Sequence, residues 1–233
     1  MPNSLPNQIA LFGHYLLELL NPWQECGPAA AIDSTVLRAK GGVWHKKDRE
    51  AGVVPHSSID TQAHWTKSGW HGWVYGWKLH LIATVGSVWI PLAAELTSAN
   101  EADNERALSL MDHLGVQVRY LLGDTHYNDP EVRLKCEEAG RVLIATRRGT
   151  KKRTDEGVEV RKIFHQLRSH SIENFNEQFK GIFDGHGSVP TKGLARTRLW
   201  ALGCVLVYQL ALLYRYESGQ ELRAGLKSFL KAA

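Results

Sequence analysis

The chain has 233 residues, of which 43% are hydrophobic and 22% charged, and this composition excludes a disordered or collagen-like protein. Its length is sufficient for one large domain or for a domain with appendages. The net charge of +4 permits a polyanionic partner but does not demonstrate one.

Hydrophobic periodicity predicts a mixture of strands and helices along the chain. The predicted strands cover residues 29–40, 73–85, 88–96, 118–122 and 141–146. The predicted helices cover residues 9–20, 100–114, 130–139 and 169–183, with a long apolar helix from residue 194. The second and third strands form an antiparallel hairpin, and residues 41–70 form a long loop. This order of elements predicts an α/β fold, a mixed sheet flanked by helices.

The chain shows no pattern typical of a targeting or membrane-spanning segment. Its N-terminus lacks a basic stretch followed by an apolar core, so no signal peptide is predicted. The longest apolar run, residues 199–214, is interrupted by Gly203 and Gln209 and is short for a membrane span, which favours a buried helix. Three cysteines without a CxxC pair favour buried thiols in a reducing compartment, so a cytoplasmic location is expected.

The stretch of residues 118–128 places a carboxylate directly after a predicted buried strand. The apolar run ends at Gly123, and Asp124 follows at once. Asp129 and Pro130 then provide the N-cap and the first residue of a helix. Ligands bind at this edge of open α/β sheets, so Asp124 is a candidate site residue. The alternative for an isolated aspartate in this position is that it only caps a loop.

Asp33, Asp124 and Glu173 together form the candidate active site. Asp33 lies inside a predicted central strand, where a carboxylate is costly to bury unless it is paired or binds a metal. Glu173 lies at the edge of the apolar stripe of its helix, with Lys180 two turns further along on the same side. Three converging carboxylates need compensating charge. A pair of Mg²⁺ ions, for which Mn²⁺ can substitute, supplies it and can clamp an in-line phosphoryl displacement.

Five motifs give the chain a resemblance to a known family. They are IDST around Asp33, YGWKLHL at residues 75–81, LTSANEADN at 96–104, LLGDTHYND at 121–129 and IENFNEQFK at 172–180. In this order and spacing, the chain from about Ile32 onwards resembles the catalytic domain of bacterial insertion-sequence transposases with an Asp-Asp-Glu triad. The resemblance implies a ribonuclease H-like fold and metal ions held by Asp33, Asp124 and Glu173. It also implies cleavage at transposon ends, followed by attack of a 3′-hydroxyl on target DNA.

The resemblance also implies partners and further site residues. The protein would bind double-stranded DNA at transposon ends and at the target, act as a homodimer and associate with the nucleoid. The family carries Tyr, Arg, Glu and Lys around its glutamate, with three residues between Arg and Glu and six between Glu and Lys. Lys180 fits the last position and would contact a DNA phosphate. Ser169 stands at the Arg position, with Arg168 one residue earlier as a second candidate DNA contact, and Gln166 stands at the Tyr position.

The most basic part of the chain falls where relatives carry an insertion before the glutamate helix. Its candidate contacts to the DNA backbone are Arg147, Arg148, Lys151 and Lys152. Such contacts give affinity without sequence choice, and a solvated charged hairpin is the alternative.

Two domains are expected on this basis. A helical lead-in over residues 1–28 is shorter than the DNA-binding region of relatives, as in a truncated copy or one piece of a split transposase. The catalytic domain covers residues 29–233, with a basic insertion at about residues 147–165.

Two other functions stay open on the sequence alone. A catalytically inactive, DNA-binding transposase remnant fits the short lead-in and the displaced Arg168. A zinc enzyme would use the dense histidines, but no HxxxH or CxxC spacing is present, and neighbouring residues of a strand point to opposite faces. The histidines are His45, His56, His64, His71 and His80. His80 is expected to be a hydrogen-bonded residue of the sheet instead.

Overall fold

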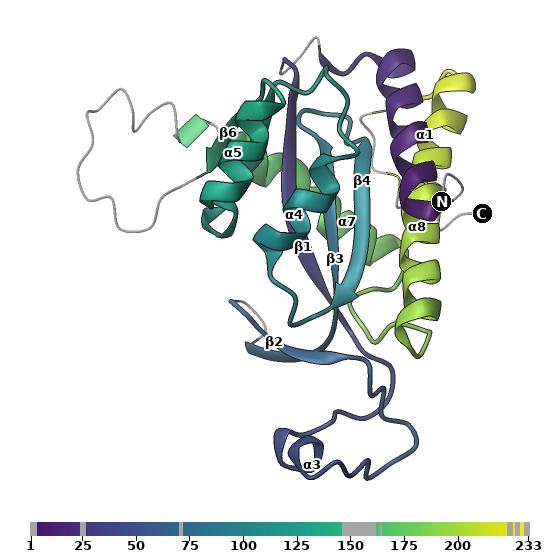
Figure 1. Ribbon diagram of the computed structural model, residues 1–233. Helices are drawn as coiled ribbons and strands as arrows, with labels where there is room; N and C mark the ends of the chain where they lie inside the picture. The colour runs from purple at the N-terminus through teal and green to yellow at the C-terminus, as the bar shows by residue number, and fades with distance from the viewer. Residues whose placement is uncertain are drawn as a thin grey trace.

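In the described part of the chain, six strands form one mixed sheet (Figure 1). The computed structural model describes residues 4–23, 27–69, 72–145, 162–163, 165–222, 226 and 229–230. The strands are β1 (Ala29–Arg38), β2 (His64–Ser68), β3 (Gly72–Thr84), β4 (Pro91–Ser98), β5 (Tyr120–Gly123) and β6 (Val142–Ala145). β1 lies in the centre, antiparallel to β3 and parallel to β5, and β4 and β6 continue the sheet on either side. The predicted α/β fold with a mixed, ribonuclease H-like sheet is confirmed.

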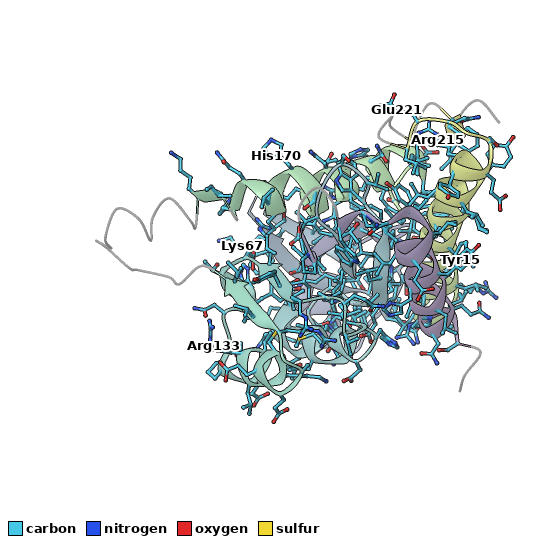
Figure 2. The ribbon with its side chains drawn as sticks, turned by 90° about the horizontal axis from the view of Figure 1, so that it is seen from above. Tyr15, Lys67, Arg133, His170, Arg215 and Glu221 are labelled. Carbon is cyan, nitrogen blue, oxygen red and sulfur yellow. The ribbon has the colours of Figure 1, made fainter. Side chains whose placement is uncertain are left out.

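Helices cover both faces of the sheet and one of its edges. They are α1 (Leu5–Leu20), α4 (Asp103–Met111), α5 (Pro130–Glu138), the π-helix η2 (Ser169–Glu173), α7 (Asn174–Ile182) and α8 (Leu194–Glu217). Figures 1 and 2 show α4 and α5 on one face and α7 on the opposite face. α1 and α8 lie side by side against β4. Each predicted helix is therefore present, although α4 is shorter than expected and the helix predicted over 169–183 begins as a π-helix.

Small residues allow β1 to lie in the middle of the sheet, where other parts of the protein bury both of its faces. The residues from Ala29 to Ile32 are fully or almost fully buried. Gly76 of β3 lies so close to β1 that an added Cβ would collide with the carbonyl oxygen of Leu37. The glycine of the YGWKLHL motif therefore permits the close approach of β3 to β1, the strand that carries Asp33.

The segment predicted as a loop, residues 41–70, contains two short elements in its described part. Helix α3 (Lys46–Glu50) and strand β2 were not predicted, and β2 extends the sheet by pairing with the first residues of β3. The segment projects from the body in Figure 1. Its base is fixed, because the buried side chain of Asp60 accepts a hydrogen bond from the backbone N–H of Gly193 at 2.6 Å.

The N-terminal helix α1 is attached to the sheet through β4 and α8. Gln209 of α8 donates hydrogen bonds to the carbonyl oxygens of Ile9 and Pro91, both at 2.8 Å, and so joins α8, α1 and β4. In the described residues, α8 is the one helix whose length and composition would suit a membrane span. Half of its apolar window is buried within the fold, which agrees with the predicted buried helix.

Candidate active site

Asp33 lies in the middle of β1, on the face of the sheet that the helix η2–α7 covers. Its side chain is 20% exposed, and one oxygen accepts a hydrogen bond from Asn176 Nδ2 at 3.1 Å. The guanidinium of Arg168 lies 4.0 Å from the other oxygen. The carboxylate that the sequence placed in a central strand is therefore contacted by two polar side chains of one helix.

The electrostatic surroundings of Asp33 show that the two other predicted acids lie near it. Burial raises the pKa of Asp33 from 3.8 to about 7, and the positive charge of Arg168 opposes this shift. The carboxylates of Asp124 and Glu173 raise the pKa further. The fold thus places Asp124 and Glu173, from distant parts of the chain, within electrostatic range of Asp33.

Asp124 follows the last residue of β5, as predicted, and β5 is the parallel neighbour of β1. Its side chain caps a short 3₁₀-helix, η1 (Thr125–Tyr127), by accepting a hydrogen bond from the backbone N–H of His126 at 2.7 Å. The other oxygen lies 2.9 Å from His126 Nδ1. The capping role considered for Asp124 is therefore observed. It fixes the carboxylate at the edge of the sheet while leaving 31% of the side chain exposed.

Glu173 is the last residue of η2 and the most exposed of the three acids, at 46% of its side chain. Its Oε1 accepts a hydrogen bond from the guanidinium of Arg168 at 2.6 Å. Because Arg168 also lies near Asp33, one guanidinium links the helix carboxylate to the strand carboxylate.

The two described residues that were predicted to contact DNA are largely buried beside the acids. Lys180 is 8% exposed and Arg168 is 7% exposed. Burial lowers the pKa of Lys180, and the carboxylates of Glu177 and Asp33 oppose this shift. Both cations therefore act on the electrostatics of Asp33. The other predicted contacts lie outside the described residues; they are Arg147, Arg148, Lys151 and Lys152.

Sequence reasoning missed Asn176. It lies three residues after Glu173 and therefore on a neighbouring part of the same helix face. Its amide nitrogen bonds Asp33, and its buried Oδ1 has no hydrogen-bond partner among the described residues. The signal that could have found it is an asparagine one helical turn after a predicted ligand.

The YGWKLHL and LTSANEADN motifs meet in a buried polar cluster on the other face of the sheet. His80 Nε2 and Thr97 Oγ1 form a hydrogen bond of 2.9 Å. Asp103 Oδ1 lies 3.2 Å from Lys78 Nζ and 3.5 Å from His80 Nδ1. Burial lowers the pKa of His80 to about 4, so its imidazole is neutral at physiological pH. His80 is thus a hydrogen-bonded residue of the sheet, as predicted.

The three acids offer carboxylate oxygens, the ligands that hard divalent cations prefer, but their side chains contact other partners. In the described ranges, no group of three His, Cys, Asp or Glu side chains is close enough to hold a metal ion, and this applies to zinc as well. Asp33 bonds Asn176, Asp124 bonds His126 and Glu173 bonds Arg168. Neighbouring carboxylates, one with a raised pKa, still concentrate negative charge that Mg²⁺ with its preference for oxygen ligands would compensate. Binding such an ion would require side-chain rotation, above all of Asp124, because both of its oxygens contact His126.

Comparisons with known proteins identify the family and a similar fold. A family model described as a transposase DDE domain matches residues 24–210, most of the chain. Among solved structures, piggyBac transposase in a synaptic complex with hairpin DNA has a similar fold, with a TM-score of 0.55 and 10% identity over 88% of this chain. The match covers 51% of that protein, so the chain spans about half its length. No curated protein matches the chain. The chain belongs to the family of transposase DDE domains.

Proposed function

We propose that the protein is a DNA transposase whose Asp33, Asp124 and Glu173 hold a pair of Mg²⁺ ions, with Mn²⁺ as a substitute. The reaction is cleavage at transposon ends, followed by attack of a 3′-hydroxyl on target DNA. The observation that carries the proposal is geometric: the Arg168 guanidinium lies against both Asp33 and Glu173, and Asp124 follows the strand that pairs with the strand of Asp33. Membership of the DDE family supports the chemistry.

The residues of the site differ in how firmly they are held. Asp33 is fixed in the central strand, and the capping bond fixes Asp124 at the end of β5. Glu173 is the most exposed of the three acids, and the hydrogen bond from Arg168 holds its Oε1. When bound, the ions supply activation of the attacking oxygen and stabilisation of the leaving oxygen. Lys180, near Asp33, adds positive charge where a DNA phosphate would lie.

The proposed partner is double-stranded DNA, both transposon ends and target, bound by a homodimer in the cytoplasm at the nucleoid. The similar solved structure is that of a transposase with DNA, which supports the kind of partner. The basic residues predicted between 147 and 152 stay candidates for contacts to the DNA backbone.

A second candidate is a catalytically inactive remnant that binds DNA. One observation favours it: Glu173 is engaged by Arg168 and Asp124 by His126, so neither carboxylate is turned towards a shared ion.

A nicking assay tests the two candidates. Labelled DNA that carries the terminal repeats of the element is incubated with the protein and Mg²⁺ or Mn²⁺. The transposase should nick the DNA only when the metal is present. Asp33→Asn, Asp124→Asn and Glu173→Gln should each lower the nicking rate about 10³-fold, or about 4 kcal/mol in the barrier. Glu177→Gln is the matched control, because Glu177 lies on the same helix and its side chain is exposed.

Two results would contradict the proposal. Unchanged nicking by Asp124→Asn would show that the triad is assigned incorrectly. Salt-sensitive DNA binding without cleavage under either ion would identify the remnant.

A further inference from the structure

Arg168 and Glu173 are five residues apart, yet their side chains meet at 2.6 Å. An α-helix turns by about 100° per residue, so five residues would leave two side chains about 140° apart around the helix. A separation of four residues would place them on one face. The contact between Arg168 and Glu173 therefore needs an irregular helix.

The π-helix η2 supplies the missing rotation. It spans Ser169–Glu173, the segment that joins the two residues. A π-turn closes its hydrogen bonds between residues i and i+5 and so takes up one more residue per turn than an α-helix. Five residues across η2 are thus equivalent to four residues of α-helix, and Arg168 returns to the face of Glu173.

Three side chains support this turn by bonding backbone carbonyl oxygens four residues earlier. Ser171 Oγ donates to Leu167 O at 2.7 Å, and Asn174 Nδ2 donates to His170 O at 2.8 Å. His170 Nδ1 lies 2.8 Å from Gln166 O. Inserting a residue disturbs the regular ladder of backbone bonds, and side-chain bonds of this kind compensate for it. The π-turn is therefore encoded by several residues of the segment.

We propose that Arg168 is a positioning residue that holds Asp33 and Glu173 at a fixed separation, and that the π-turn brings it into register. Its guanidinium contacts Glu173 at 2.6 Å and lies 4.0 Å from Asp33, and the residue is 7% exposed. A planar guanidinium with several donors suits such a bridge between two carboxylates. The catalytic consequence rests on the proposed function, whereas the pairing of Arg168 with Glu173 does not.

Arg168 has opposite effects on metal binding and on catalysis. Its positive charge near the carboxylates opposes a cation, so its removal should leave metal affinity unchanged or tighter. Loss of the bridge lets the carboxylates move, and a misplacement of about 1 Å lowers a reaction rate about 10²-fold. A residue that only stabilised the fold would affect both properties in the same direction.

The first test compares Mn²⁺ affinity, measured by electron paramagnetic resonance of the free ion, with nicking at saturating Mn²⁺. Arg168→Ala should nick about 10²-fold more slowly than the wild type, without a weaker affinity for Mn²⁺. Arg106→Ala is the matched control, because Arg106 contacts Glu101, also five residues away, but lies on α4. Nicking by Arg168→Ala at the wild-type rate, or a joint loss of Mn²⁺ binding and nicking, would overturn the inference.

The second test changes the register of the helix. His170 is exposed on the outer side of the helix, as its label in Figure 2 shows, so its removal spares the core. Deleting His170 brings the two positions to a separation of four residues, and a regular α-helix then keeps Arg168 at Glu173. Nicking should stay within about fivefold of the wild type, whereas one alanine inserted after His170 should lower it about 10²-fold. Equal rates in the two variants would overturn the role of the π-turn.

A third measurement is independent of catalysis. In a double-mutant cycle of thermal unfolding, Arg168→Ala and Glu173→Gln should together lower the Tm by less than the sum of their separate effects. Additive effects would refute the pairing even if the wild-type protein nicks DNA. Coupling in a protein that does not nick would uphold the pairing and refute the proposed function instead.

Discussion

The side-chain amide of Asn176 donates a hydrogen bond to Asp33 Oδ2 at 3.1 Å and so joins helix α7 to the central strand across 143 residues of sequence. The bond orients one oxygen of Asp33, while the other oxygen faces Arg168. Asn176 therefore contributes to the geometry of the site although it carries no charge.

Replacing Asn176 by alanine should lower the nicking rate about tenfold, because the loss of one hydrogen bond of about 1 kcal/mol allows Asp33 to rotate. Asn176→Asp should be worse, since it adds a second carboxylate beside Asp33 in a buried site. The measurements are nicking rates and the Tm with and without Mg²⁺. Glu177→Gln again serves as the control, and wild-type nicking by Asn176→Ala would remove Asn176 from the site.

Lys180 should contribute one phosphate contact when the protein binds transposon-end DNA. Lys180→Met keeps the aliphatic stem and removes the charge, so the slope of log affinity against log salt should fall by about 0.9. Fluorescence anisotropy at a series of salt concentrations measures this slope. Lys135→Met is the control, because Lys135 lies on α5, on the opposite face of the sheet. An unchanged slope for Lys180→Met would show that this amine does not contact a phosphate.

The buried imidazole of His80 should make the fold sensitive to acid. Burial lowers its pKa to about 4, Asp103 opposes the shift, and Lys78 and Arg106 add to it. Between pH 6.5 and pH 4 the unfolded chain protonates this histidine while the folded protein does not, so the contribution of His80 to the free energy of unfolding falls as the pH falls. The raised pKa of Asp33 acts in the opposite direction over this range. The upper bound of the His80 effect is about 3 kcal/mol.

Urea unfolding at several pH values checks the role of His80. The variant His80→Gln can still bond Thr97 but does not titrate, so on going from pH 6.5 to pH 4 its free energy of unfolding should rise relative to that of the wild type. His186→Gln, which alters an exposed histidine, should keep the wild-type pH dependence. The same pH dependence in His80→Gln would assign the acid sensitivity to other groups.

Two glycines should respond to alanine in opposite directions. Gly76→Ala would place a methyl group against the backbone of Leu37 and Ala39, which cannot give way without moving β1, so it should destabilise the fold by about 2 kcal/mol or more. Gly203 lies inside α8 with open space around its missing side chain, so Gly203→Ala should stabilise by about 1 kcal/mol. Urea unfolding measures both, and equal effects would contradict this account.

Local signals in the sequence were sufficient to place the strand carboxylates. The apolar run that ends at Gly123 predicted β5, with Asp124 just beyond it. Asp129 and Pro130 predicted the start of α5, where the Asp129 side chain accepts a hydrogen bond from the backbone N–H of Glu131 at 2.9 Å. Both signals depend only on neighbouring residues, and for that reason they could be read without the fold.

Features that depend on distant partners could not be predicted in this way. Strand β2 has five residues and is defined by its pairing with β3. The role of Asn176 depends on Asp33, which is remote in sequence. The π-turn depends on bonds from particular side chains to backbone carbonyl oxygens, which hydrophobic periodicity does not reveal, so Arg168 looked one position out of place.

The parallel pairing of β1 with β5, followed by β6 and then the helix of Glu173, means that synthesis on the ribosome delivers the third acid last. On the proposed function, a nascent chain that has not yet emerged as far as this helix cannot cut DNA. DNA cleavage would thus begin only after synthesis has passed Glu173, when Asp33 and Asp124 have already left the ribosome.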